Sequence, residues 1–165
     1  MYARRMVRVF VVAWTLVFLS GCGSAEDRVG SDREVPYRPV ASVKQLMDSV
    51  LDPAADVVWD SAGFVITAEG ETDLQPTTPE GWLRVQNSAV VLAESGNLLM
   101  LPGRSAGPDW ISHATALAEA GRAAVSAAEA RDAEALFDAG GVVYQACRAC
   151  HVQFMVSQGE VRSMP

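Results

Sequence analysis

Two thiols and an imidazole stand together near the C-terminus, at Cys147, Cys150 and His151. Cys-x-x-Cys-His is the pattern to which a c-type haem is covalently attached. The thiols add to the vinyl groups of the porphyrin, and the imidazole becomes the proximal ligand of the iron. On a helix these residues occupy positions i, i+3 and i+4, so they project from one face. We therefore predict one covalent haem c on Cys147 and Cys150, with His151 as an axial iron ligand.

Two other uses of a Cys-x-x-Cys pair remain open. A structural metal site needs further Cys or His ligands, and the only other histidine of the chain is His113. A redox-active dithiol is expected in a thioredoxin-like βαβ context, whereas strand-like runs are few here. A histidine such as His113 is more often a surface or core residue, so we do not expect it to be a second iron ligand.

The N-terminal residues have the pattern of an export signal. Arg4, Arg5 and Arg8 precede the apolar run Val9–Leu19. That run is too short to cross a bilayer as a helix and has the length of a signal-peptide core. We therefore predict that the mature protein is exported.

The apolar run ends in Leu19-Ser20-Gly21-Cys22, which resembles the lipobox of bacterial lipoproteins. The resemblance implies that residues 1–21 are a lipoprotein signal peptide and that Cys22 is lipidated at the new N-terminus. Gly23 stands where an inner-membrane retention signal has Asp, which favours the outer membrane as the site of the anchor if the cell is Gram-negative. An ordinary cleavable signal with a chance cysteine is the alternative.

The chain after residue 21 has the length of one domain preceded by a polar segment. Residues 22–39 are polar and charged, and Pro36 and Pro39 oppose a continuous helix, so we expect a flexible tether. Residues 40–165 then form the single domain. All three cysteines of the chain have a use, one with lipid and two with haem.

Four stretches of the domain have apolar residues at helical spacing. They cover residues 40–57, 78–99, 108–128 and 132–154. The last three begin at typical start signals, namely Thr78-Pro79-Glu80, Pro108-Asp109 and Asp132. We predict an all-α fold, an antiparallel four-helix bundle with the haem on its C-terminal helix.

Two connections and one proline refine this expectation. Pro53 interrupts the first stretch, and Asp52 before it has the character of an N-cap, so we expect a bend or a restart there. The few residues around Arg131 force the last two helices to be antiparallel neighbours. Residues 64–67, in the longer first connection, are expected to be a short extended piece.

A four-helix arrangement with Cys-x-x-Cys-His near the C-terminus resembles the class II c-type cytochromes, the cytochrome c′ family with its low-spin relatives. The resemblance covers roughly residues 40–156, and the phrases at 51–56 and 92–98 are similar to those of exported relatives of cytochrome c′. Met155 stands where family members often have a basic residue. A class I cytochrome c has its haem motif near the N-terminus, which argues against that family here.

The resemblance implies that the first helix covers the distal face of the haem, where Met47 lies on its apolar stripe. In low-spin relatives a methionine there ligates the iron, and a thioether is a soft ligand that suits haem iron. In cytochrome c′ proper the iron is five-coordinate and binds small gases such as NO or CO. We therefore expect an electron-transfer cytochrome with Met47 as the distal ligand, with a gas-binding cytochrome c′ as the alternative and a non-haem dithiol protein as the weaker one. Met47 as a core residue also remains open.

Charge and composition limit the partners. Removing the three arginines of residues 1–21 takes the formal net charge from −7 to −10, so nucleic acid is not an expected partner. An acidic surface steers a protein toward a basic redox partner, although a generally acidic soluble surface is the simpler explanation of the charge. The expected surroundings are the periplasm, the membrane through the lipid anchor, a redox partner protein and, as an open alternative to the monomer, a second copy of the chain. No catalytic dyad or triad is evident, so we do not expect an enzyme.

Several further residues have a structural explanation beside a functional one. Aromatic residues at helical spacing are more often core than cofactor contacts, and surface cations more often solvated than paired with propionates. Because Gly140 has no side chain, either the porphyrin or a neighbouring helix could approach the backbone closely there. The aromatic and cationic candidates are Trp59, Trp82, Trp110, Lys44, Arg84 and Arg104.

Overall fold

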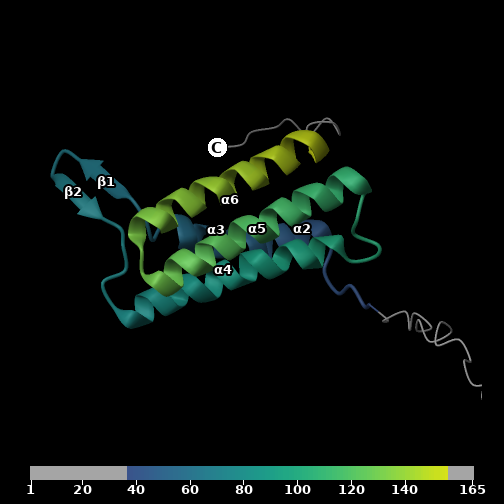
Figure 1. Ribbon diagram of the computed structural model, residues 1–165. Helices are drawn as coiled ribbons and strands as arrows, with labels where there is room; N and C mark the ends of the chain where they lie inside the picture. The colour runs from purple at the N-terminus through teal and green to yellow at the C-terminus, as the bar shows by residue number, and fades with distance from the viewer. Residues whose placement is uncertain (1–36, 156–165) are drawn as a thin grey trace, which may run out of the picture. The chain divides into compact units, whose positions relative to one another are not determined.

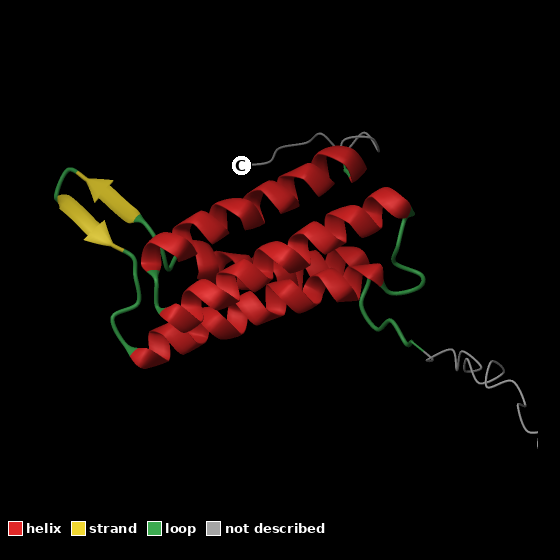
Figure 2. Ribbon diagram, in the orientation of Figure 1, coloured by secondary structure: helices red, strands yellow, loops and turns green. Residues whose placement is uncertain are grey.

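The computed structural model of the chain describes residues 37–155, and these are mostly helical (Figures 1 and 2). The elements in chain order are α2 (Val43–Leu46), η1 (Met47–Leu51), α3 (Asp52–Trp59), β1 (Phe64–Thr67), β2 (Gly70–Asp73), α4 (Pro79–Met100), α5 (Pro108–Ala130) and α6 (Ala133–Phe154). The all-α prediction is confirmed at this level, with one small antiparallel sheet added to it. None of the helices in this part of the chain is long and apolar enough to cross a membrane. The predicted signal peptide, Cys22 and most of the predicted tether lie outside the described residues.

The long helices begin where their capping residues predict. The Thr78 side chain accepts a hydrogen bond from the Gly81 amide at 3.1 Å, and Asp132 accepts one from the Ala135 amide at 3.0 Å. Each bond satisfies one of the amides that a helix start leaves without a partner. The α5–α6 link contains Arg131 in a left-handed conformation, with φ 54°. The short link turns the chain back, so that α5 and α6 run in opposite directions as predicted (Figure 1).

The N-terminal helical segment changes its geometry where a bend or a restart was predicted, but Asp52 does not cap a new helix. Asp52 is itself helical, with φ −57° and ψ −51°, and α3 begins without a side-chain cap. The chain instead stays helical from Val43 to Trp59 through the π-helical turn η1, in which the Asp52 amide donates to the Met47 carbonyl. Pro53 explains this turn, because its ring lacks an N–H and in an α-helix would clash with the carbonyl four residues earlier. The wider π turn accommodates the proline without ending the helix.

Helices α4 and α5 approach each other closely through two glycines. A Cβ atom on Gly96 would lie 2.5 Å from the Ala114 carbonyl oxygen, and one on Gly121 would lie 2.5 Å from the Ala93 amide nitrogen. Both distances are shorter than non-bonded atoms allow, so these positions require glycine. The Ala- and Gly-rich sequence of α5 thus permits the close contact with α4.

The hydrophobic core consists of two clusters along the helices. One lies toward the hairpin end and includes Val58, Val85, Leu92, Leu136 and Val143. The other lies toward the opposite end and includes Leu46, Leu51, Leu99, Trp110 and Leu117. Cys147 packs against both clusters. The sequence motif therefore lies at the junction of the two halves of the core.

Candidate functional site

A cavity of about 540 Å³ lies among the N-terminal helical segment, α4, α5 and α6. This volume is in the range of pockets that bind cofactors and drug-sized ligands, about 300–1,000 Å³. Its wall is largely apolar and contains all four residues that the motif and the resemblance suggested around the cofactor. Those residues are Met47, Cys147, Cys150 and His151.

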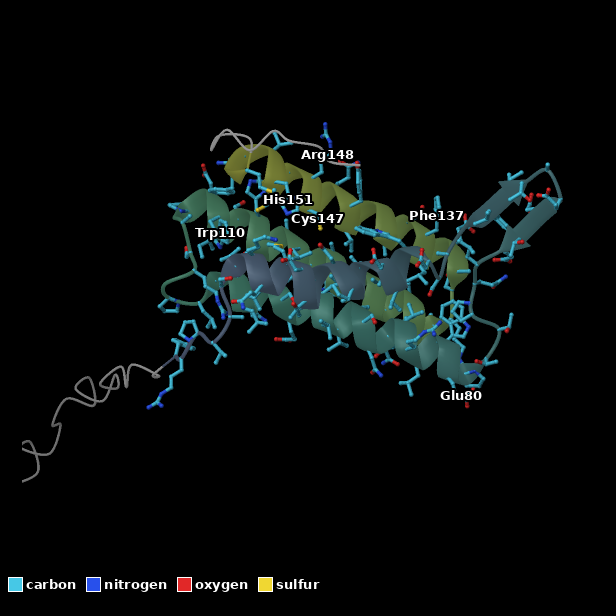
Figure 3. The ribbon with its side chains drawn as sticks, turned by 180° about the vertical axis from the view of Figure 1, so that it is seen from behind. Glu80, Trp110, Phe137, Cys147, Arg148 and His151 are labelled. Atoms are coloured by element: carbon cyan, nitrogen blue, oxygen red, sulfur yellow. The ribbon has the colours of Figure 1, made fainter. Side chains whose placement is uncertain are left out.

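One wall is a face of α6. Cys147, Cys150 and His151 are half-buried and line the cavity together, as their helical spacing predicts. Figure 3 shows Cys147 and His151 on the side of α6 that faces the other helices. This helix remains regular through the motif as far as Phe154, so it fixes the spacing of the three side chains.

The two cysteines are free thiols that resist ionisation. Burial raises the pKa of the Cys147 thiol to about 11, with smaller contributions from the negative charge of Asp52 and from Cys150. Burial also raises the pKa of Cys150. Both groups therefore stay protonated at neutral pH, in contrast to reactive thiols, whose pKa values are lowered.

The N-terminal helical segment forms another wall, and its π turn decides which residues belong to it. Met47 and Asp52 both line the cavity, together with Leu51, Ala55 and Trp59. In a continuous α-helix, residues five apart would point about 140° away from each other. The π turn brings Met47 and Asp52 onto the same wall. The α-helical pattern of the sequence therefore gave no indication that Asp52 would line the cavity.

His113, which the sequence left as a surface or core residue, also lines the cavity. It is half-buried, and its Nε2 lies 2.7 Å from Gln153 Oε1, while Gln153 Nε2 donates to Asp109 Oδ2 at 2.8 Å. Because the amide nitrogen of Gln153 is engaged by a carboxylate, its oxygen is the atom that accepts from His113. This arrangement places a proton on His113 Nε2 and holds that nitrogen toward α6. The Phe154 ring lies edge-on to His113, with the ring centroids 6.0 Å apart.

Two of the three tryptophan candidates line the cavity, namely Trp59 and Trp110, whereas Trp82 is buried in the core away from it. Each of the two is held by its indole N–H: Trp59 donates to the Gly140 carbonyl at 3.0 Å and Trp110 to the Leu99 carbonyl at 2.8 Å. A Cβ on Gly140 would lie 3.3 Å from the Trp59 ring. The glycine thus makes room for a neighbouring helix.

The cations considered for propionate pairing do not line the cavity. Lys44 pairs with Asp48 at 2.7 Å, and the Arg104 guanidinium donates to the carbonyls of Leu98 and Ala41. Arg84 is exposed on α4. Among residues 37–155, Arg148, between the two cysteines of the motif, is the Arg or Lys residue that lines the cavity. Its place within Cys-x-x-Cys was the signal that could have identified it.

Within residues 37–155 no group of three or more His, Cys, Asp and Glu side chains is placed to hold a metal ion by itself. The chain matches no protein-family model, no curated protein and no solved structure.

Proposed function

We propose that the protein is a c-type cytochrome of the periplasm, anchored to a membrane through Cys22, that carries one covalent haem in an antiparallel four-helix bundle and transfers electrons. The observation that carries the proposal is the shared cavity of Cys147, Cys150, His151 and Met47. The two thiols would bind the porphyrin covalently, and His151 would ligate the iron. The haem would supply an iron that cycles between the ferric and ferrous states.

The cavity fits such a group in size and in chemistry. Its volume of about 540 Å³ and its largely apolar wall suit a large, flat, mostly apolar molecule. The porphyrin itself provides four nitrogen ligands, so the protein needs to supply only axial ligands. His151 on α6 and Met47 on η1 are the candidates for these positions, and they come from different walls.

The pKa values of the two thiols argue against a redox dithiol. Proteins that exchange thiols and disulfides lower the pKa of the attacking cysteine. Here burial raises the pKa of Cys147 to about 11 and raises that of Cys150 as well. Thiols that stay protonated at neutral pH are poorly suited to the thiolate chemistry of a redox dithiol.

A five-coordinate, gas-binding cytochrome c′ is the second candidate. The apolar residues near Met47, such as Leu51 and Ala55, would form a distal wall open to small uncharged gases. The half-buried Met47 thioether on that wall supports the electron carrier, because it offers the iron a second protein ligand.

Haem content tests the proposal directly. We expect protein produced with a cytochrome c maturation system to contain one haem that resists acid extraction and gives a c-type pyridine haemochrome spectrum. Cys147→Ala and Cys150→Ala should each leave one thioether or none, whereas the control Cys22→Ala should keep both. The same control tests the anchor, because it should move the protein from the membrane fraction to the soluble fraction. Protein without covalent haem under these conditions would refute the proposal.

A further inference from the structure

A second hollow, of about 320 Å³, lies between α3 and the first half of α6. Its lining includes Trp59 and Tyr144, which also line the large cavity. Their rings meet edge-on with centroids 6.4 Å apart. These two side chains are therefore shared between the wall of the cavity and the outer hollow.

The hollow opens on an exposed apolar surface. Phe137 and Tyr144 are 61% and 53% exposed, although both are large aromatic residues. The exposed side chains of β1 lie nearby, because a Cβ on Gly63, just before that strand, would come 3.1 Å from the Phe137 ring. Figure 3 shows Phe137 on the part of α6 that lies beside the hairpin. Contiguous apolar surface of this kind marks sites of interaction.

The charged side chains of the two segments that form this apolar surface are all acidic. The segment 52–83, which contains α3 and the hairpin, has seven acidic residues and no Lys or Arg. The first part of α6, residues 133–147, adds Glu134 and Asp138 and again no basic residue. The nearest cations in sequence are Arg84, Arg131 and Arg148, and Arg148 lies one helical turn beyond Tyr144. An apolar centre flanked by these acidic segments is complementary to a basic protein surface with an apolar centre.

We infer that the hollow formed by α3 and α6, with Phe137 at its surface, is the docking site of a redox protein with a basic surface. The inference rests on the proposed function, because it assigns the exchange to the group attached at Cys147. One electron leaves the reduced metal centre of one protein and reaches the oxidised centre of the other, and no covalent bond forms or breaks. Docking here separates the partner from the cofactor cavity by little more than the side chains of Trp59 and Tyr144.

Electron-transfer kinetics with a cationic donor test the inference on the haem-loaded protein. The donor is a lysine-rich class I cytochrome c in its ferrous form, and stopped-flow absorbance gives the second-order rate constant. Attraction between opposite charges should make this constant fall as ionic strength rises. At low salt the double variant Asp60→Lys/Asp138→Lys should react about tenfold more slowly or worse, because steering changes association rates by 10-fold to 1,000-fold.

Two control variants distinguish this site from general charge and general apolarity. The double variant Glu94→Lys/Glu119→Lys makes the same change of charge on the exposed surfaces of α4 and α5, and Leu83→Ser removes an exposed apolar side chain of α4. Phe137→Ser should slow the reaction several-fold, whereas Leu83→Ser should not. An equal loss of rate with Glu94→Lys/Glu119→Lys, or a rate that is insensitive to salt, would overturn the docking site.

A binding measurement tests the docking surface separately from the haem. In NMR spectra, binding of the donor should shift the amide resonances of residues 59–66 and 134–144 of this protein. Resonance shifts confined to the outer faces of α4 and α5 would contradict the docking site. Shifts of the hollow's resonances that depend on protein concentration in the absence of donor would also contradict it, because they would show that a second copy of the chain occupies the hollow. Absence of haem would refute the proposed function, while these shifts would still locate the docking surface.

Discussion

Cys147 lies where burial and negative charge both oppose its ionisation. In the haem-free protein its pKa is raised from 9.0 to about 11, first by burial and then by Asp52. The folded state therefore favours the thiol, so this contribution to stability is fully present below about pH 9 and is lost as pH rises through about pH 11. Alkylation of Cys147 by iodoacetamide, followed by mass spectrometry, should keep accelerating up to about pH 11.

The neighbouring carboxylates of α3 provide a matched pair for this test. Asp52→Asn should lower the pKa of Cys147 and speed its alkylation at pH 9, because it removes a negative charge from the cavity wall. Asp56→Asn removes the same charge one turn further along the helix, from a residue outside that wall, and should have a smaller effect. Equal rates for both variants would contradict the close approach of Asp52 to Cys147.

Met47 distinguishes the electron carrier from the gas binder. If its thioether ligates the iron, the ferric protein should be low-spin and Met47→Leu should be high-spin, because leucine fills similar volume without a ligating atom. His113→Ala is the control from another part of the cavity wall and should leave the iron ligands unchanged. Absorbance and electron paramagnetic resonance spectra report the spin state. A wild-type protein that is already high-spin and binds carbon monoxide rapidly would favour the cytochrome c′ alternative.

At the scale of single residues, the sequence predicted the parts of the cavity that depend on local spacing. Cys147, Cys150 and His151 are within five residues of one another, so one helix settles their relation. Met47 followed from its apolar stripe and the family resemblance. Asp52 and His113 could not be predicted in the same way. Asp52 reaches the wall through a π turn, and His113 through packing of α5 against α6.

Helices α4 and α5 depend on close contact at their glycines. Gly121→Ala would place a Cβ 2.5 Å from the backbone nitrogen of Ala93, so the two helices would have to move apart. We expect the free energy of unfolding to fall by about 1–3 kcal/mol, the usual cost of an overpacked core. Gly141→Ala is the control, because its Cβ meets nothing within 4 Å and alanine favours a helix by about 0.8–1.0 kcal/mol. Urea unfolding measures both, and a stable Gly121→Ala protein would contradict the close helix contact.

Among the helices and strands too, features set by local sequence could be predicted, whereas features set by distant residues could not. Helix starts at Thr78 and Asp132 were predictable because a cap is a local hydrogen bond between residues three apart. The extended piece Phe64–Thr67 was predicted from its apolar, β-branched residues, but its partner Gly70–Asp73 is polar and exposed and has no such pattern. The pairing of Phe64 with Asp73 joins residues that no local rule relates.

At the scale of the whole molecule, the cavity lies at the junction of the two core clusters, and Cys147 packs against both of them. A haem attached there would contact both clusters at once, and so it should contribute to the stability of the entire domain and not of one helix alone. Any group that binds only the folded state stabilises it. The cavity of about 540 Å³ is also much larger than the space left by removing one side chain.

The double variant Cys147→Ala/Cys150→Ala tests this dependence on the cofactor. Single Leu→Ala cavities cost about 3–5 kcal/mol, so the haem-free double variant should be less stable than the haem-loaded protein by at least about 3 kcal/mol. Thermal unfolding followed by circular dichroism should show a lower midpoint for α-helix loss and a broader transition. Cys150→Ala, in which one thioether can still hold the haem, should fall between the two. An unchanged midpoint without haem would mean that the two clusters hold the helices together by themselves, and that the cavity is a binding site which folding does not require.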